Sequence, residues 1–348
     1  MLKKLMEKSK ILPVKKVLPE DEEVHSILIY VGGDLIGDGL MKLPFLRALR
    51  SAYPKSHISW CAGKHKSTFT RELAPLITGM IDRVIEKAGF DKPFKFLYKR
   101  PLGGQKFDLI IDTQRSFLTT ILVKRIRHKI FISGTADFLF SDIKPVRPYI
   151  RPLLMIHQMM DLLEIASAKV PNPNFELILP NAEKVLASKV LPKGPLYIGL
   201  APGAGDLKKC WPIKNFIEVA KNQLELGRKP VFILGPNELS SVEKLRKAVP
   251  DALYPTAPTD DFSAPTISFS IALSRRLTAA VANDSGAGHI LALADIRLIS
   301  LFGPTLPEKF APAVKKSKVI EAQNFGGTHM KDIPINAVLE AINVILEN

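Results

Sequence analysis

The chain alternates short apolar runs, rich in β-branched residues, with longer helical patterns, and it does so in two successive series. Strands that alternate with helices are typical of a parallel sheet whose two faces are covered by helices. In the first series we expect strands at 26–31, 57–61, 83–85, 109–112 and 129–132. In the second we expect strands at 196–201, 230–234, 279–283 and 297–301. The pattern therefore predicts two α/β domains with doubly wound parallel sheets.

The length supports the same division. A chain of 348 residues, 46% of them hydrophobic, is too long for one typical core. The Pro/Asn-rich stretch 170–174 and the turn-rich stretch 191–195 look like an interdomain connection. We therefore expect domains at 25–175 and 176–348, with an alternative in which the last helix packs back on the first domain.

A basic extension is expected over residues 1–24, where six lysines lie among apolar side chains. It is either a short amphipathic membrane-surface segment or a frayed tail, because Pro13 and Pro19 interrupt any helix. The sequence lacks an apolar stretch near the ~20 residues that a spanning helix needs, and the N-terminus is too charged for a secretory signal. We expect a cytoplasmic protein.

Cysteine content and charge limit the kinds of protein and of ligand that fit this sequence. Cys61 and Cys210 are far apart and have no histidine at metal-ligand spacing, which argues against a disulfide scaffold and a structural zinc site. Residues 1–150 carry a net charge of +12 and residues 151–348 one of +3. Such a field attracts a nucleic acid, an anionic membrane surface or an anionic substrate, or it is a solvated basic face. Without a recognisable nucleic-acid motif, the first of these is the weakest.

The run from Val281 to His289 places small residues, a carboxylate and an imidazole where a buried strand becomes a helix. The helix expected over 286–294 offers unpaired backbone N–H groups and the positive end of its dipole, which suit a phosphate. The plain alternative is that Asp284 or Ser285 only caps the helix.

The first expected strand is followed by the glycine-rich turn 32–39 and a helix expected over 40–50. This turn lacks both the G-x-G-x-x-G fingerprint and a phosphate-loop G-K-[ST], which disfavours an NAD or ATP site. It presents Asp38 at the helix entrance, where the carboxylate is an N-cap or points into a cleft.

Two turns of the second series also carry polar side chains. The turn 201–212 holds glycines beside Lys208 and Lys209, which are either solvated or counter-charges for a diphosphate. The turn 234–238 ends at Glu238, which either caps the next helix or accepts hydrogen bonds from a ribose diol. Ligand chemistry at the carboxyl ends of such strands would lie in a cleft between the domains if those ends face each other.

Taken in order, these turns resemble the ADP-heptose:lipopolysaccharide heptosyltransferases of glycosyltransferase family 9. The resemblance covers most of the chain from Ser26. The motifs that carry it are Ile36-Gly-Asp38 with Pro44, Ile110-Ile-Asp-Thr-Gln114 with Arg115-Ser116, Pro202-Gly203 with Lys209-Cys-Trp-Pro212, and Asn283-Asp-Ser-Gly-Ala-Gly-His289 with Phe302-Gly-Pro304. It implies the GT-B arrangement, two Rossmann-like domains facing across a cleft, with the acceptor on the N-terminal side and the nucleotide sugar on the C-terminal side. An acceptor built on phosphorylated lipid A and acidic Kdo sugars would suit the basic first half.

The resemblance also implies an activity: inverting transfer of a heptose from ADP-heptose to a lipopolysaccharide inner-core acceptor, without a metal or cofactor. Asp38 matches the base, and Asp34 is a candidate to share or exchange that role. Lys209 matches the lysine on the diphosphate. The residues that match the donor site are Gly203, Lys209, Glu238, Asp284, Ser285, Gly286 and His289. Gln114 and Arg115 are candidates for acceptor binding, and the enzyme would work at the inner face of the cytoplasmic membrane.

Departures from the family pattern leave alternatives open. Ser285 stands where threonine is common, and Ala204 and Gly205 replace hydroxyl residues of the diphosphate loop, so some phosphate contacts would be made by backbone alone. The alternatives are an enzyme of this fold with another nucleotide sugar or acceptor, and a non-catalytic nucleotide-binding member. A nicotinamide oxidoreductase is disfavoured by the missing glycines, and the oligomeric state stays open.

Overall fold

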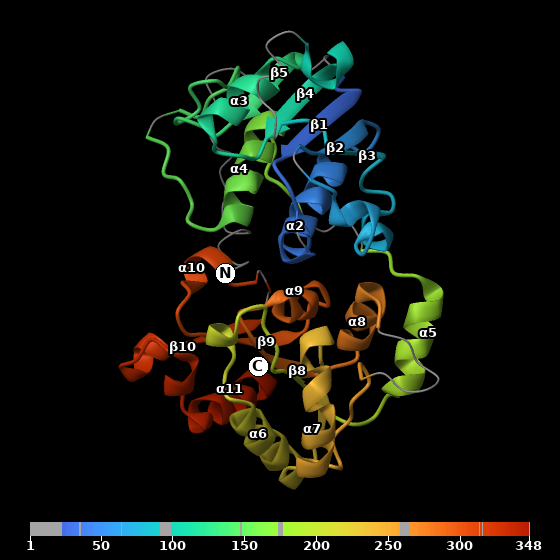
Figure 1. Ribbon diagram of the computed structural model, residues 1–348, viewed down its shortest axis with the longest axis vertical. Coiled ribbons are helices and arrows are strands. Elements are labelled where there is room, and N and C mark those ends of the chain that lie inside the picture. Colours follow the sequence, from blue (N-terminus) through green and yellow to red (C-terminus); the bar gives the residue numbers. More distant parts are fainter. Residues whose placement is uncertain are drawn as a thin grey trace. The chain divides into compact units, whose positions relative to one another are not determined.

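The structure is a computed structural model that describes residues 23–347 except 35, 64, 91–98, 147, 173–176, 258–264, 313 and 315. The described residues form two compact units, of which the first ends at Ile178 and the second begins at Leu179. Each unit contains one five-stranded parallel sheet with helices around it (Figure 1). The expected α/β class with two doubly wound sheets is confirmed. The basic extension expected over 1–24 lies almost wholly outside the described residues.

The first sheet has the strand order β3-β2-β1-β4-β5, and all of its pairs are parallel. Its strands are β1 (Ser26–Val31), β2 (His57–Ala62), β3 (Arg83–Glu86), β4 (Lys106–Asp112) and β5 (Arg127–Ser133). Three helices of this unit are α2 (Ile36–Ala52), α3 (Phe117–Lys124) and α4 (Met155–Ser167). The central strand β1 is buried from Ile27 to Val31, as expected when helices cover both faces of a parallel sheet.

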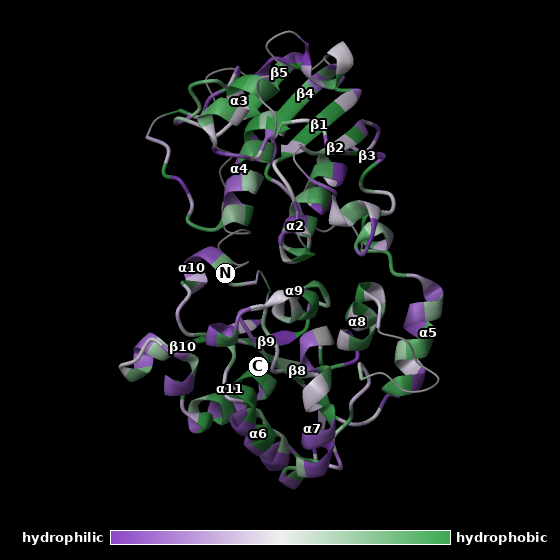
Figure 2. Cartoon of the chain, viewed as in Figure 1, coloured by the Kyte–Doolittle hydropathy of each residue, from purple (hydrophilic) through white to green (hydrophobic). Residues whose placement is uncertain are grey.

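The second sheet has the order β10-β9-β8-β6-β7, again with parallel pairs. Its strands are β6 (Tyr197–Ala201), β7 (Lys229–Phe232), β8 (Ala279–Asn283), β9 (Arg297–Phe302) and β10 (Ser317–Glu321). The helices of this unit include α5 (Asn181–Val190), α6 (Ile213–Glu225), α7 (Val242–Ala248), α8 (Ile267–Ser274), α9 (Gly286–Leu293), α10 (Pro307–Phe310) and α11 (Ile335–Glu347). In Figure 2 the central strands of the first sheet are mainly hydrophobic, while the outer helices of the second unit alternate between the two colours.

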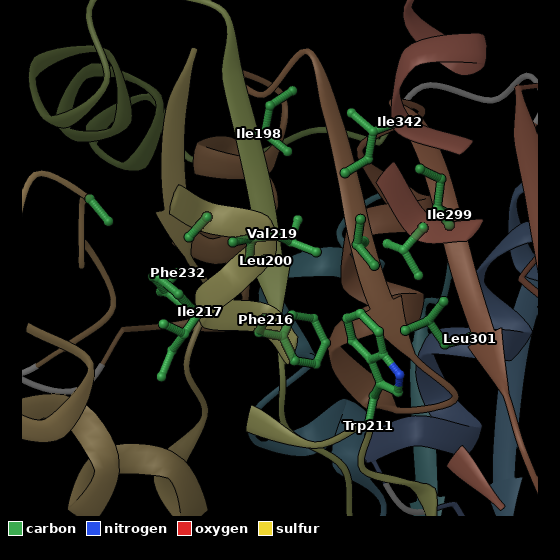
Figure 3. Packing of buried hydrophobic residues seen from close by; sticks show 14 of the residues in the cluster. Ile198, Leu200, Trp211, Phe216, Ile217, Val219, Phe232, Ile299, Leu301 and Ile342 are labelled. Atoms are coloured by element: carbon green, nitrogen blue, oxygen red, sulfur yellow. The ribbon is translucent and has the colours of Figure 1, made fainter. Parts of the chain in front are cut away.

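The core of the second unit lies between its sheet and the helices α6 and α11. Figure 3 shows Phe216 of α6 beside Trp211, and Ile342 of α11 near Ile299 of β9. Helix α11 contacts β8, β9 and β10 as well as α6. The C-terminal helix therefore belongs to the core of the second unit.

The structure differs most from the sequence-based expectation in two elements, β10 and α2. Strand β10 was not expected, because its short sequence Ser-Lys-Val-Ile-Glu has only two apolar residues and forms an edge of the sheet. Helix α2 begins at Ile36, four residues before the expected start. As a result Asp38 lies inside the first helical turn and is not the N-cap residue.

Candidate functional site

Strand order identifies one position in each sheet where a ligand is expected. In the first sheet the order reverses between β1 and β4, and in the second between β6 and β8. Loops that leave the carboxyl ends of such strands diverge to opposite faces of the sheet and leave a crevice. The turns singled out in the sequence follow these four strands, so the topology pairs them: 32–38 with 113–116, and 202–209 with 284–289.

In the first unit the two turns touch. A Cβ atom placed on Gly32 would lie 3.0 Å from Oε1 of Gln114, so the glutamine side chain rests against the glycine that follows β1. The backbone N–H of Gln114 donates to Asp112 Oδ1 at 2.9 Å. Gln114 is thus held beside the turn that leads to Asp38.

The two carboxylates of this turn have different surroundings. Asp34 is buried, and its Oδ2 accepts hydrogen bonds from the hydroxyls of Ser67 at 2.7 Å and Thr68 at 3.4 Å. Burial raises its pKa, although the Ser67 hydrogen bond and the charge of Lys42 oppose the shift. Asp38 is half-buried, and among the described residues its carboxylate accepts no hydrogen bond. Asp34 therefore suits a structural role, whereas Asp38 is the carboxylate available to an incoming hydroxyl group.

A buried lysine accompanies this pair. Lys42 lies one helical turn after Asp38, its Nζ is 3.5 Å from the carbonyl oxygen of Gly33, and it is only 4% exposed. Burial lowers the pKa of Lys42, against the opposing effect of the Asp38 and Asp34 carboxylates. The lysine is thus near enough to feel the charge of both the buried and the accessible carboxylate.

Arg115 is the second acceptor candidate of the first unit. Its guanidinium donates to Gln158 of α4 and to the carbonyl oxygen of Gly134, both at 2.9 Å. Burial and the nearby charge of Arg151 lower its pKa. Arg115 and Arg151 therefore form a cationic pair at the same edge of the sheet as Gln114.

In the second unit the two turns are joined by an ion pair. Lys209 Nζ lies 2.8 Å from Asp284 Oδ2, and the same oxygen accepts a hydrogen bond from Thr305 Oγ1 at 2.8 Å. Asp284 is buried, while the Lys209 side chain is 30% exposed and its ammonium lies over the ring of Phe310. Asp284 therefore positions a lysine that still reaches solvent. Lys208 differs, since it is exposed and its backbone N–H binds the side chain of Asp206.

Asn283 fixes the backbone of the turn after β6 at both of its ends. Its Nδ2 donates to the carbonyl oxygen of Pro202 at 2.7 Å, and its Oδ1 accepts from the backbone N–H of Trp211 at 3.1 Å. The Trp211 indole in turn donates to the carbonyl oxygen of Ile333. One buried amide thus holds the turn after β6 against the end of β8.

Helix α9 begins where the sequence predicted a phosphate site. Ser285 is its N-cap residue and accepts a hydrogen bond from the backbone N–H of Gly288. A Cβ atom on Gly286 would meet nothing within 4 Å, so the first turn borders open space. His289 follows Ser285 by four residues and therefore lies on the same side of the helix. The capping role of Ser285 is confirmed, and the N–H groups of this turn are placed where an anion could reach them.

Glu238 lies close to the same turns. Its Oε2 accepts the backbone N–H of Gly235 at 2.9 Å, so it caps its own short helix. A Cβ atom on Gly203 would lie 2.3 Å from its carboxyl carbon, so only a glycine at 203 lets the carboxylate come this near. Glu238 caps the helix with one carboxylate oxygen while its carboxyl group lies against Gly203 of the turn 202–209, so the ribose alternative stays open beside the capping role.

The structure adds residues that the sequence did not indicate. Lys42 and Ser67 flank the carboxylates of the first unit, and Thr305 and Phe310 flank Lys209. A lysine within the apolar face of α2 was a usable signal, whereas the other three contacts depend on long-range folding. Among the described residues, no group of three acidic, histidine or cysteine side chains could hold a metal ion. Both cysteines are free thiols.

Comparison with known proteins finds relatives that match most of the chain. The family model described as glycosyltransferase family 9 (heptosyltransferase) matches residues 96–334. The lipooligosaccharide heptosyltransferase 2 of Haemophilus influenzae is 22% identical, over 92% of this chain and 99% of its own length.

Solved structures show the same fold. A glycosyl transferase family 9 protein from Veillonella parvula has a TM-score of 0.70 at 20% identity and covers 94% of this chain and 99% of its own. The E. coli ADP-heptose lps heptosyltransferase II has a TM-score of 0.64 at 21% identity, with coverages of 92% and 98%. The expected GT-B class is confirmed.

Proposed function

Because the chain belongs to glycosyltransferase family 9 and is a glycosyltransferase, we propose that it transfers a heptose from ADP-heptose to a lipopolysaccharide inner-core acceptor. Its relatives are named for heptosyl transfer to lipooligosaccharide or lipopolysaccharide, and one is named for ADP-heptose. The observation that carries the proposal is the Lys209–Asp284 ion pair beside the open N-terminal turn of α9.

The proposed reaction is a single displacement. Asp38 removes the proton of the acceptor hydroxyl as that oxygen attacks the anomeric carbon and the bond to the ADP oxygen breaks, which inverts the configuration. Negative charge then grows on the departing diphosphate. A cation and helix N–H groups aimed at that charge stabilise the transition state more than the bound substrate. Lys209, Ser285, His289 and the first turn of α9 can supply these interactions in the second unit.

The surroundings of each group support its role. Asp38 keeps its carboxylate accessible, whereas Asp34 is buried and has one carboxylate oxygen bonded to hydroxyl donors, which favours Asp38 as the base. Asp284 holds Lys209 in place, so we assign Asp284 to positioning the lysine. Glu238 beside Gly203 supports a ribose site next to the diphosphate loop. Gln114 and Arg115 are proposed to bind the acceptor. No metal or cofactor is part of the proposal.

The proposed place of action is the cytoplasmic face of the inner membrane, where the protein would bind as a peripheral protein. No helix of the described residues has the length and apolarity needed to cross a bilayer. The net charge of +12 over residues 1–150 favours an anionic acceptor.

Calorimetric titration with ADP, UDP, GDP and NAD tests the donor site. We expect selective binding of ADP, weakened together with transfer in Lys209→Ala and unchanged in Lys208→Ala, which is the matched control. Preference for UDP or GDP would change the donor and keep the enzyme class. Failure to bind any nucleotide would favour a non-catalytic member of the family.

Asp38→Asn and Asp38→Ala test the base. Both should lower the turnover rate by about a hundredfold or more, since a general base typically contributes that much or more. ADP affinity should stay that of the wild-type protein, because Asp38 belongs to the first unit. Equal loss of ADP binding in these variants would contradict the assignment of roles.

A further inference from the structure

Helix α3 exposes an apolar face that nothing in the proposed reaction uses. Phe117, Leu118 and Ile121 are 56%, 58% and 37% exposed, although all three are large hydrophobic residues. The opposite side of the helix is packed into the unit. Its buried residues are Thr119, Thr120, Leu122 and Val123. The helix is therefore apolar on both sides, and Figure 2 shows most of its ribbon in the hydrophobic colour.

Cations continue the same face. Lys124 and Arg125 follow Phe117 and Ile121 at helical spacings of seven and four residues, so they lie on the outward side. We define the α3 face as Phe117, Leu118, Ile121, Lys124 and Arg125. Between Asp112 and Asp137 the sequence has five lysines or arginines and no acidic residue. Lys124 is half-buried: its Nζ donates to the carbonyl oxygen of Phe140 and lies 3.4 Å from Asp142, an acid beside this face, whereas Arg125 is exposed.

Residues around the α3 face add further exposed apolar side chains and further cations. The ring of Phe117 packs edge-on against Phe140 at 5.1 Å between centroids, next to Leu139, which is 60% exposed. Past the C-terminal end of α3, Arg125 lines a cavity of about 480 Å³ together with Arg100, Lys106 and Arg127. An apolar ridge thus ends at a cavity rich in arginine and lysine.

We propose that the α3 face docks the protein on an anionic lipid bilayer, with the apolar side chains at the acyl boundary and the cations on headgroup phosphates. Apolar side chains flanked by lysine and arginine bind this interface through both burial and charge. A protein partner would more commonly meet charges of both signs, whereas this face offers almost only cations.

Chain connectivity favours a bilayer as well. Helix α3 starts at the carboxyl end of β4, directly after Gln114 and Arg115. A surface that holds lipid headgroups there would present a lipid-borne acceptor at the edge where the acceptor candidates lie. The lipid-borne acceptor is taken from the proposed function. Docking on the bilayer itself needs neither the donor nor the acceptor.

Co-sedimentation of the full chain with vesicles tests the docking. One set contains phosphatidylcholine alone and the other phosphatidylcholine mixed with phosphatidylglycerol, both without acceptor. We expect binding to the mixed vesicles that weakens at high salt and falls at least about tenfold in the double variant F117D/L118D. Aspartates at these first two helical positions favour the helix dipole, so α3 should still form.

The matched control is V185D/L226D in the second unit. These residues are 53% and 50% exposed, so the variant makes the same change in charge and also removes two exposed apolar side chains, elsewhere in the molecule. It should bind like the wild-type protein. Both variants keep residues 1–22, so any binding by the lysines of that segment is the same in each.

Three results would overturn the proposal. They are failure of the wild-type protein to bind mixed vesicles, unchanged binding of F117D/L118D, and equal loss of binding in the control. Self-association in sedimentation velocity that only F117D/L118D abolishes, without vesicle binding, would instead make the face a contact between copies. We expect Asp38→Asn to lose transfer and to keep vesicle binding. Failure of the docking proposal can therefore be distinguished from failure of the catalytic proposal.

Discussion

Buried charge gathers at the carboxyl edge of the first sheet, where Asp34, Lys42 and Asp112 are each more than nine-tenths buried. Burying an ion costs free energy unless hydrogen bonds or an opposite charge compensate it. Asp34 has the Ser67 hydroxyl and the charge of Lys42, and Asp112 accepts from Thr120 at 2.6 Å. Two experiments at single residues test this compensation.

Lys42→Met should destabilise the protein by roughly 3 kcal/mol, because it leaves the buried Asp34 without its counter-charge. Urea unfolding measures the effect. If the two charges are coupled, the double variant D34N/K42M loses less than the sum of the single variants. Strict additivity would show that Lys42 does not compensate Asp34.

Asp112→Asn should change how stability depends on pH. Burial raises the pKa of Asp112 to about 6, against hydrogen bonds from Thr120, Gln114 and Ser133. Because the pKa of Asp112 is higher in the folded state than in the unfolded state, the folded state binds a proton at a higher pH. The free energy of unfolding therefore increases as pH falls through 6. From pH 7 to pH 5 the wild-type protein should gain about 1 kcal/mol relative to the variant. Parallel stability curves from urea titrations at several pH values would refute this.

Among the secondary-structure elements, α9 links stability most directly to ligand binding. Ser285 caps the helix, and the same hydroxyl and first turn are proposed to meet phosphate. Both roles depend on a short polar side chain at the end of β8. Stability and affinity should therefore change together at this position.

Ser285→Ala should lower the free energy of unfolding by about 1 kcal/mol, a typical loss for an N-cap, and weaken ADP binding. Ser285→Thr retains a hydroxyl and should keep both. Chemical unfolding and calorimetry measure the two effects. ADP affinity that stays the same in Ser285→Ala would remove the serine from the donor site while leaving its capping role.

Elements with strong periodicity were predicted from sequence, but their ends were predicted well only where the sequence pattern marks them clearly. Strand β8 and helix α9 match the expected ranges within one residue, since each is bounded by clear apolar and glycine patterns. Strand β4 begins at Lys106, three residues early, because pairing with β5 continues through polar residues. Strand β10 was missed for the same reason, as an edge strand needs few apolar side chains.

At the scale of the whole molecule, each of the two units has its own sheet and its own apolar core. One buried cluster centres on Ile110 and Phe131, and the other on Trp211 and Phe216. A unit with a complete core can fold alone. We therefore expect residues 179–348, expressed separately, to unfold cooperatively and to bind ADP.

Circular dichroism and calorimetry on this fragment check the expectation. Lys209→Ala in the fragment should weaken ADP binding as in the full chain. A fragment that folds and fails to bind ADP would show that the first unit contributes to the nucleotide site. A fragment without a cooperative transition would show that its core depends on the first unit. The cleft expected between the domains stays a prediction.

The sequence by itself determined the class of fold and the turns that carry function, because strand–helix periodicity and glycine-rich turns are local properties. Tertiary structure decided which turns meet. Strand order placed Lys209 against Asp284, 75 residues apart, and committed Asp34 but not Asp38 to hydroxyl donors. It also left the apolar side of α3 exposed. Such outcomes depend on long-range packing, where burial and charge compensation are set by residues far away in the chain.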